Sequence, residues 1–128
     1  MVEQRILDSF QTMWGPFPEP VMLIHKTRTI LAVNDFARAM GIPAGSKCSG
    51  LNPEAIGDHE HCSRCQADLA FKTGETVCTE ESVAGKTIIG YWMPLKEIPD
   101  VYVHFGIGSG EAMLAAKVAS GAGKLVNL

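Results

Sequence analysis

The chain has 128 residues, of which 46% are hydrophobic and 20% are charged. These proportions are typical of one soluble globular domain and exclude an intrinsically disordered chain. The formal net charge of −3 argues against binding to nucleic acid or to an acidic membrane surface, since both call for basic patches. No apolar run reaches the ~20 residues that span a bilayer, and the N-terminus has no signal-peptide pattern. We therefore expect a cytoplasmic protein in a reducing compartment.

Residues 3–14 predict an amphipathic helix, because apolar side chains recur there at i, i+3 and i+4 spacing. The proline-rich stretch at residues 15–20 ends this helix, since proline removes a donor and restricts the preceding residue. We expect its apolar face to pack on the open face of a sheet or on a second copy of the chain. The side chains in question are Ile6, Phe10, Met13 and Trp14.

Two short apolar runs, at residues 21–25 and 29–33, predict a pair of strands. The three residues between them leave room only for a tight hairpin turn. Asn34 is a favourable N-cap for a short helix at residues 35–40, which Gly41 terminates.

The second half of the chain predicts a helix, three strands and a final helix. The helix covers residues 62–72 and ends at Thr73 and Gly74. The strands cover residues 76–83, 87–94 and 101–107, and the final helix covers residues 111–119. The last strand alternates strictly, which places Val101, Val103, Phe105 and Ile107 on one face.

All four cysteines lie between residues 48 and 78. Thiolates are soft ligands that suit zinc and iron–sulfur clusters, and a C-x-x-C pair at a helix start lets two sulfurs reach one metal. Cys48 can fold back as a third ligand, and Cys78 competes with His59 or His61 for the last place. A metal site therefore draws on Cys48, Cys62, Cys65, Cys78 and His61, with zinc or an iron–sulfur cluster as the candidate cofactor.

Two other roles for the cysteines stay open. Cys62 and Cys65 can form a reversible disulfide, or the cysteines can simply pack in the core. A c-type haem is disfavoured, because Gln66 stands where its attachment motif needs histidine.

Several side chains are candidates to line a cavity between a sheet and its helices, where a small-molecule ligand could bind. They are Trp92, Phe105 and Met40. His104 alternates with the apolar residues of its strand, so we expect it to face solvent or an interface. No serine or cysteine stands in a recognisable catalytic triad, so we do not expect an enzyme.

The order of these segments resembles a PAS domain over about residues 17–110. The resemblance is carried by the opening hairpin with Asn34, by Gly45-Ser46-Lys47-Cys48, by Thr73-Gly74-Glu75 and by the strand at residues 101–107. Within that family the chain is similar to a subgroup with a G-x-K-C … C-x-x-C … T-G-E pattern, common in bacterial sensor proteins. The resemblance implies an α+β fold, a five-stranded antiparallel sheet with helices on one face. Residues 1–16 then form an N-terminal flanking helix, and residues 111–128 form a C-terminal helix and a flexible tail.

The resemblance also implies a role in signal transduction. We expect a module that senses redox state, a metal or a small ligand and signals through homodimer contacts, a partner or an output domain. The alternative is a protein–protein interaction module, used for dimerisation, whose cysteines are purely structural. PAS domains that carry an iron–sulfur cluster use two C-x-x-C pairs, whereas this chain has one.

Overall fold

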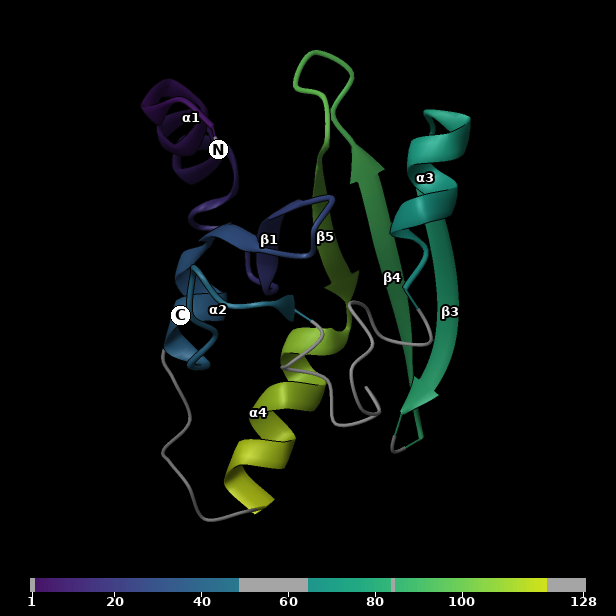
Figure 1. The fold of residues 1–128 in the computed structure, drawn as a ribbon. Coiled ribbons are helices and arrows are strands. Elements are labelled where there is room, and N and C mark those ends of the chain that lie inside the picture. The colour runs from purple at the N-terminus through teal and green to yellow at the C-terminus, as the bar shows by residue number, and fades with distance from the viewer. Residues whose placement is uncertain (1, 49–64, 84, 120–128) are drawn as a thin grey trace.

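The computed structural model describes residues 2–48, 65–83 and 85–119. This part of the chain forms a five-stranded antiparallel sheet with the strand order β2-β1-β5-β4-β3, together with helices α1 to α4 (Figure 1). The helices are α1 (Gln4–Trp14), α2 (Asp35–Ala39), α3 (Ala67–Thr73) and α4 (Ser109–Ala119). The strands are β1 (Val21–His25), β2 (Ile30–Val33), β3 (Val77–Val83), β4 (Lys86–Pro94) and β5 (Val101–Ile107). The predicted α+β fold class and antiparallel sheet are confirmed.

Strand β5 lies at the centre of the sheet, and its register sorts the side chains between two faces. His104 of β5 lies opposite Trp92 of β4 and Met22 of β1. Phe105 lies opposite Tyr91 in the same way. Because neighbouring residues of a strand point to opposite faces, Trp92 and Phe105 lie on different sides of the sheet.

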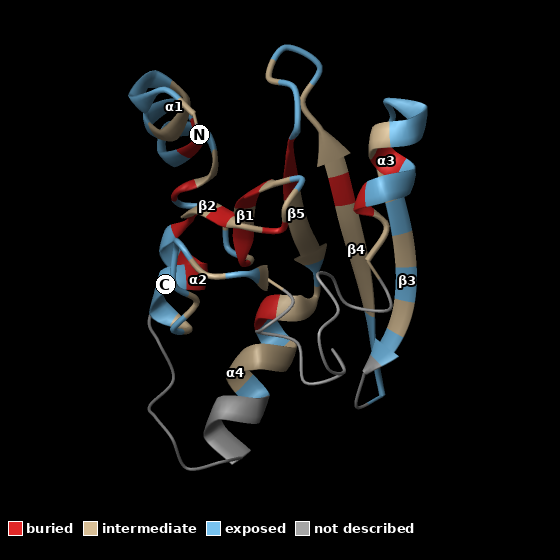
Figure 2. Ribbon diagram, in the orientation of Figure 1, coloured by how far each residue is buried: buried red, intermediate tan, exposed pale blue. Residues whose placement is uncertain are grey.

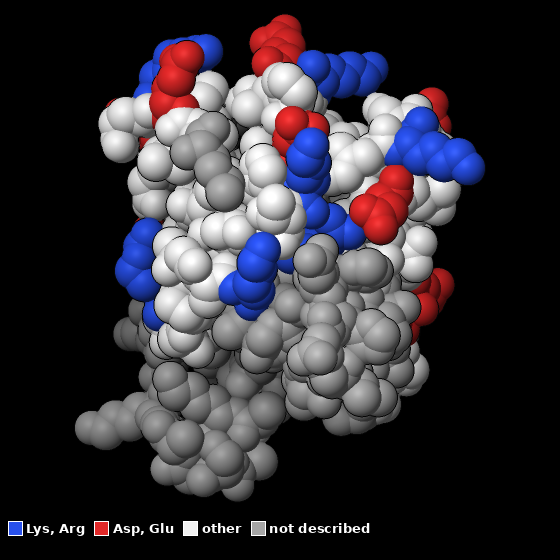
Figure 3. All heavy atoms as spheres, in the orientation of Figure 1, with Lys and Arg blue, Asp and Glu red and all other residues white. Residues whose placement is uncertain are grey.

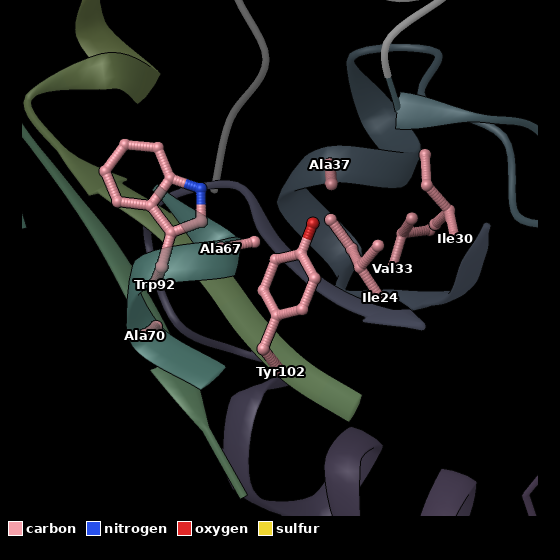
Figure 4. Packing of buried hydrophobic residues seen from close by; sticks show 8 residues of the cluster. All are labelled: Ile24, Ile30, Val33, Ala37, Ala67, Ala70, Trp92 and Tyr102. Carbon is pink, nitrogen blue, oxygen red and sulfur yellow. The ribbon is translucent and has the colours of Figure 1, made fainter. Parts of the chain in front are cut away.

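One face, here called the inner face, is covered by α2 and α3. Its buried cluster consists of Ile24, Ile30, Val33, Ala37, Ala67, Ala70, Trp92 and Tyr102 (Figure 4). Figure 2 shows that burial is concentrated on β1, β2, β5 and the sheet-facing sides of α2 and α3. This cluster is the core beneath the candidate site.

The opposite face, here called the outer face, is covered by α1. Its buried cluster consists of Phe10, Val21, Leu23, Val101 and Val103, with Ile6, Leu7, Trp14 and Phe105 packed around it. The prediction that the first helix packs on the open face of the sheet is therefore confirmed. Met13 is the exception within that helix, because its side chain is 74% exposed.

Helix α3 begins later than predicted. Cys65 and Gln66 are not helical, and Gln66 takes the N-cap position with φ −108° and ψ 14°. Ala67, Ala70 and Phe71 lie at i, i+3 and i+4, so they share the face of α3 that meets the sheet. The two small alanine side chains let the helix approach the sheet closely. The prediction of a helix over residues 62–72 is thus wrong for residues 65 and 66, and Cys65 precedes the helix.

Asn34 joins the segment before β1 to helix α2, and its side chain is fully buried. Its Oδ1 accepts hydrogen bonds from the backbone N–H of Ala37 at 3.1 Å and of Val21 at 3.0 Å, which confirms the predicted N-cap. Its Nδ2 donates to three backbone oxygens, those of Trp14, Phe17 and Glu19. One side chain therefore connects α1, β1 and α2.

On one face of the molecule, the charged residues are not gathered by sign. On the face drawn in Figure 3, lysine and arginine side chains lie interspersed with aspartate and glutamate. Among the residues that the structure describes, no helix is both long and apolar enough to cross a bilayer.

Candidate thiol site on the inner face

Two of the cysteines meet the inner face from segments far apart in the sequence. Cys48 and Cys65 are both half-buried, and both pack against the inner cluster. The backbone of Cys48 is held to the β1–β2 turn, since its N–H donates to the carbonyl oxygen of Arg28 at 2.9 Å. Cys65 lies just before α3. The fold therefore places on one face of the sheet two thiols that the sequence separates.

Tyr102 of β5 lies beneath these thiols and is 1% exposed. Its ring meets Phe71 of α3 edge to face at a centroid distance of 5.6 Å. Figure 4 shows the ring standing between Ala67 on one side and Ile24 on the other. Burial, and then the neighbouring Cys48 and Cys65, raise the pKa of Tyr102 far above its ordinary value. The hydroxyl group therefore keeps its proton and forms a hydrogen bond with the side chain of Cys48.

Arg28 brings a buried positive charge to the same place. It lies in the turn between β1 and β2 at a φ of 71°, and it is 4% exposed. Nη2 donates to Oδ1 of Asp68 in α3 at 2.8 Å, and Nη1 donates to the backbone oxygen of Lys26. The guanidinium carbon lies 5.9 Å from the centre of the Tyr102 ring. This ion pair ties α3 to the turn.

The charge state of Arg28 follows from these neighbours. Burial on its own lowers the pKa of Arg28, but the hydrogen bond to Asp68 and the nearby Cys65 raise it, and the net shift is upward. Nε is buried and has no hydrogen-bond partner within the described part of the chain. A buried cation with one unused donor is costly for a purely structural role, which marks this corner of the inner face as a candidate site.

Cys78 does not join this group. It lies in the edge strand β3 opposite Tyr91, with an exposed side chain. Its neighbour Val77 packs on the inner cluster, so Cys78 points to the outer side of the sheet. The expectation that Cys78 can share a site with Cys48 and Cys65 is therefore corrected by the alternation of the strand.

The candidate metal ligands among the described residues do not form a complete metal site. Within residues 2–48, 65–83 and 85–119, no three His, Cys, Asp or Glu side chains are grouped so as to hold a metal ion. Cys62, His59 and His61 lie outside the described residues. Of the candidate ligands, the described residues place Cys48 and Cys65 on the inner face.

The three candidate cavity residues are not brought together. Trp92 is buried on the inner face, whereas Phe105 lies on the outer face, where it stacks on Tyr91 at 4.8 Å and meets Trp14 at 5.2 Å. Met40 is the C-cap of α2 and belongs to neither buried cluster. Because the register separates Trp92 from Phe105, the two cannot line one cavity.

His104 is not the solvent-facing residue that the alternation predicted. Its ring stacks on Trp92 at a centroid distance of 4.7 Å, and its Nδ1 lies 2.8 Å from the backbone oxygen of Tyr91. Since a carbonyl oxygen only accepts, Nδ1 donates, and burial lowers the pKa of His104, so that the ring is neutral. The prediction was wrong because both faces of β5 are covered, which the alternation of one strand cannot reveal.

The sequence reasoning also missed Arg28, Asp68 and Tyr102 as members of the site. Arg28 stands in a hairpin turn, where a charged residue ordinarily faces solvent, and Tyr102 has the spacing of an ordinary strand residue. No local pattern indicated this arrangement; in the structure an isolated antiparallel bridge between Thr29 and Lys47 joins the G-x-K-C segment to the hairpin.

Comparison with known proteins gives matches in structure only. No protein-family model matches the chain, and no curated protein matches it. A domain of an HTR-like protein from Haloarcula marismortui is 18% identical with a TM-score of 0.50, and the match covers 70% of this chain and 93% of that one. A sensory box sensor histidine kinase from Vibrio cholerae is 14% identical with a TM-score of 0.57, over 81% of this chain and 87% of that one.

A third structure is the PAS domain of BvgS from Bordetella pertussis, which is 17% identical with a TM-score of 0.46, over 92% of this chain and 96% of that one. At these identities the similarity concerns the fold and not the chemistry of the site. The similarity to the Vibrio cholerae structure, at a TM-score of 0.57, and the strand order β2-β1-β5-β4-β3 show that this chain has a PAS-like α+β fold.

Proposed function

We propose that this chain is a signal-sensing module whose sensing chemistry takes place at Cys48 and Cys65. The observation that carries the proposal is that both thiols pack on the inner face, beside a buried tyrosine hydroxyl and a buried arginine. The fold adds support, since one structure with the same fold is that of a sensory box sensor histidine kinase. Redox state or a soft metal ion is the signal that two thiols suit best.

The site is placed so that a chemical change there can reach two elements. Cys48 is joined through its backbone to the β1–β2 turn, and Cys65 directly precedes α3. The pair of Arg28 and Asp68 connects the same turn to the same helix. If oxidation or metal binding draws the two thiols together, α3 shifts relative to the turn, and a homodimer contact or a partner that recognises this surface responds. Such a response requires that the signal favour one of two arrangements.

The proposal is tested with three single substitutions, Cys48→Ser, Cys65→Ser and Cys78→Ser. Cys78 is the matched control, because it is a cysteine of the same chain that points to the other face. Protein purified without oxygen is analysed for bound metal, by elemental analysis and absorption spectrum, and for thiol oxidation by hydrogen peroxide, by mass spectrometry. We expect Cys48→Ser and Cys65→Ser to lose the bound metal or the oxidised product, and Cys78→Ser to keep it.

Two results would contradict the proposal. One is that the three variants behave alike, which would make thiol chemistry independent of the inner face. The other is that wild-type protein holds no metal and that neither Cys48 nor Cys65 reacts. The cysteines would then be packing residues, and the interaction module would be the better description. Circular dichroism of each variant shows whether a loss reflects chemistry or unfolding.

A further inference from the structure

The segment between α1 and β1 is attached to the start of α4 by a single carboxylate. Oε2 of Glu19 accepts a hydrogen bond from the backbone N–H of Gly108 at 2.6 Å, and Oε1 accepts one from Gly110 at 2.7 Å. The first N–H groups of a helix have no partner within the helix and carry partial positive charge. A carboxylate that receives two of them stabilises the helix start more than a neutral cap does.

The backbone around α4 is shaped to admit this carboxylate. A Cβ at Gly110 would lie 2.7 Å from Oε1 of Glu19 and 2.9 Å from Cζ of Phe36, so no larger residue fits without displacement. Gly108 has a φ of 92°, a conformation that favours glycine. Both glycines are therefore needed for α4 to start against Glu19 and α2.

The main chain of Glu19 is held as firmly as its side chain. Its carbonyl oxygen accepts a hydrogen bond from Nδ2 of Asn34 at 2.8 Å. The same Nδ2 group also binds the carbonyl oxygens of Trp14 and Phe17. One residue thus stands in a continuous chain of hydrogen bonds that runs from the end of α1, through the cap of α2, to the first turn of α4.

Helix α4 has little else to hold it within the described part of the chain. Figure 1 shows it extending from the end of β5, beyond the sheet. Apart from Glu19, its polar links to the other elements there are a hydrogen bond from Oγ of Ser109 to the backbone oxygen of Gly106 in β5, at 2.6 Å, and an ion pair between Glu111 and Lys86, whose side chains are 71% and 45% exposed. Exposed ion pairs of this kind contribute little.

We propose that Glu19 is a latch that fixes α4 to the domain and couples its position to the segment that follows α1. With the carboxylate in place, α4 is held where its first N–H groups meet Glu19. When that segment shifts, the two hydrogen bonds break together, and α4 is released while the sheet stays folded. The latch would give this module a route by which a change at one end of the chain reaches the other, independent of the thiol chemistry proposed above.

The test is Glu19→Gln, examined by amide hydrogen exchange on the full chain. Glutamine keeps the size of the side chain and one acceptor oxygen, but its NH2 group cannot accept the second hydrogen bond. We expect amides of α4 to exchange at least about tenfold faster, since loss of a cap alone shifts helix opening by up to about thirtyfold. Amides of β1 and β5 should be unchanged.

Glu97→Gln is the matched control, because it makes the same change at an exposed glutamate in the turn before β5. Gly108, which binds Glu19, follows the opposite end of that strand. It should leave exchange in α4 at the wild-type rate. Gly110→Ala should reproduce the effect of Glu19→Gln, since the added methyl group occupies the place of the carboxylate.

Unchanged exchange in α4 of Glu19→Gln would overturn the latch. If that variant unfolds as a whole, Glu19→Asp replaces it, which keeps the charge and shortens the side chain by one methylene group. Faster exchange confined to α4 would then support the latch, and either no change or an equal increase in every element would overturn it.

Discussion

Both faces of the sheet bury a cluster of apolar side chains, but the two faces carry different chemistry. On the outer face, α1 closes over an aromatic group in which Trp14, Phe17 and Phe105 pack at centroid distances of 5.2 to 6.1 Å. On the inner face, the cover is formed by the short helices α2 and α3, and Arg28 and Tyr102 are buried among the apolar side chains.

The outer face is thus mainly a packing surface, whereas the inner face also holds polar and reactive groups. The outer face gains stability from dispersion and from the removal of apolar surface from water, with few polar atoms to satisfy. The inner face buries a guanidinium and a phenol beside two thiols, which costs solvation free energy and is tolerated where the groups are paired. A small domain has little stability to spare, so the polar groups gathered on the inner face make that face the candidate for function.

Asn34→Ala is expected to lower the free energy of unfolding most, because it removes the hydrogen bonds that connect the outer face to the inner face. The side chain forms five hydrogen bonds that connect α1 on the outer face to α2 on the inner face. We expect the free energy of unfolding to fall by about 4 kcal/mol, at ~1 kcal/mol for most of these bonds. Urea denaturation measures it. A fall below about 1 kcal/mol would mean that the two faces are connected elsewhere.

Phe10→Ala should weaken the packing of α1 on the outer face and leave the inner face unchanged. Phe10 is 5% exposed and is the buried residue of α1, so we expect a loss of about 3 kcal/mol in the free energy of unfolding. Met13→Ala is the control within the same helix, and its 74% exposed side chain should change stability by less than about 0.5 kcal/mol. Thiol reactivity of Cys48 and Cys65 should be unchanged in folded Phe10→Ala protein. A change there would show that the faces are coupled.

The smallest expected effect is on the pH dependence of the free energy of unfolding, which reports on the burial of His104 on the inner face. Burial lowers the pKa of His104 below its ordinary value of 6.5, with the bond to Tyr91 opposing the shift in part. As pH falls below about 6.5, the unfolded chain binds a proton before the folded one does, so stability decreases, with a slope of up to about 1.4 kcal/mol per pH unit. Above that pH the histidine contributes no slope.

His104→Gln isolates this contribution. The variant should show a smaller dependence of the free energy of unfolding on pH between about 5 and 6.5 than the wild type does. Equal pH profiles for the two proteins would mean that the ring is protonated as easily in the folded state as in the unfolded one. The inner face would then be more open to water than the stacking on Trp92 indicates.

Local patterns predicted most of the elements. The amphipathic first helix, the hairpin, the cap at Asn34 and the strands β3 to β5 each depend on residues close together in sequence. The start of α3 was the failure, because Cys65 and Gln66 have no local signal that stops a helix, and the position of Ala67 against the sheet decides where it begins.

The candidate site was predicted only in part. Cys48 and Cys65 were chosen for their chemistry, and the fold places both on the inner face. Cys78, Trp92 and Phe105 were grouped with other residues without knowledge of the strand register, and it is the register that sends Cys78 and Phe105 to the outer side. Arg28 gave no signal at all, since its burial results from α3 closing over the hairpin turn.

The sequence by itself thus predicted most of the helices and strands and singled out the cysteines as the candidate site. Those properties follow from periodicity, composition and turn residues, which act over a few positions. The tertiary structure alone decided which cysteines share the inner face, that His104 stacks on Trp92, that Arg28 is buried and that Glu19 binds the start of α4. These depend on strand order and register, and contacts between distant segments are not encoded in any local pattern.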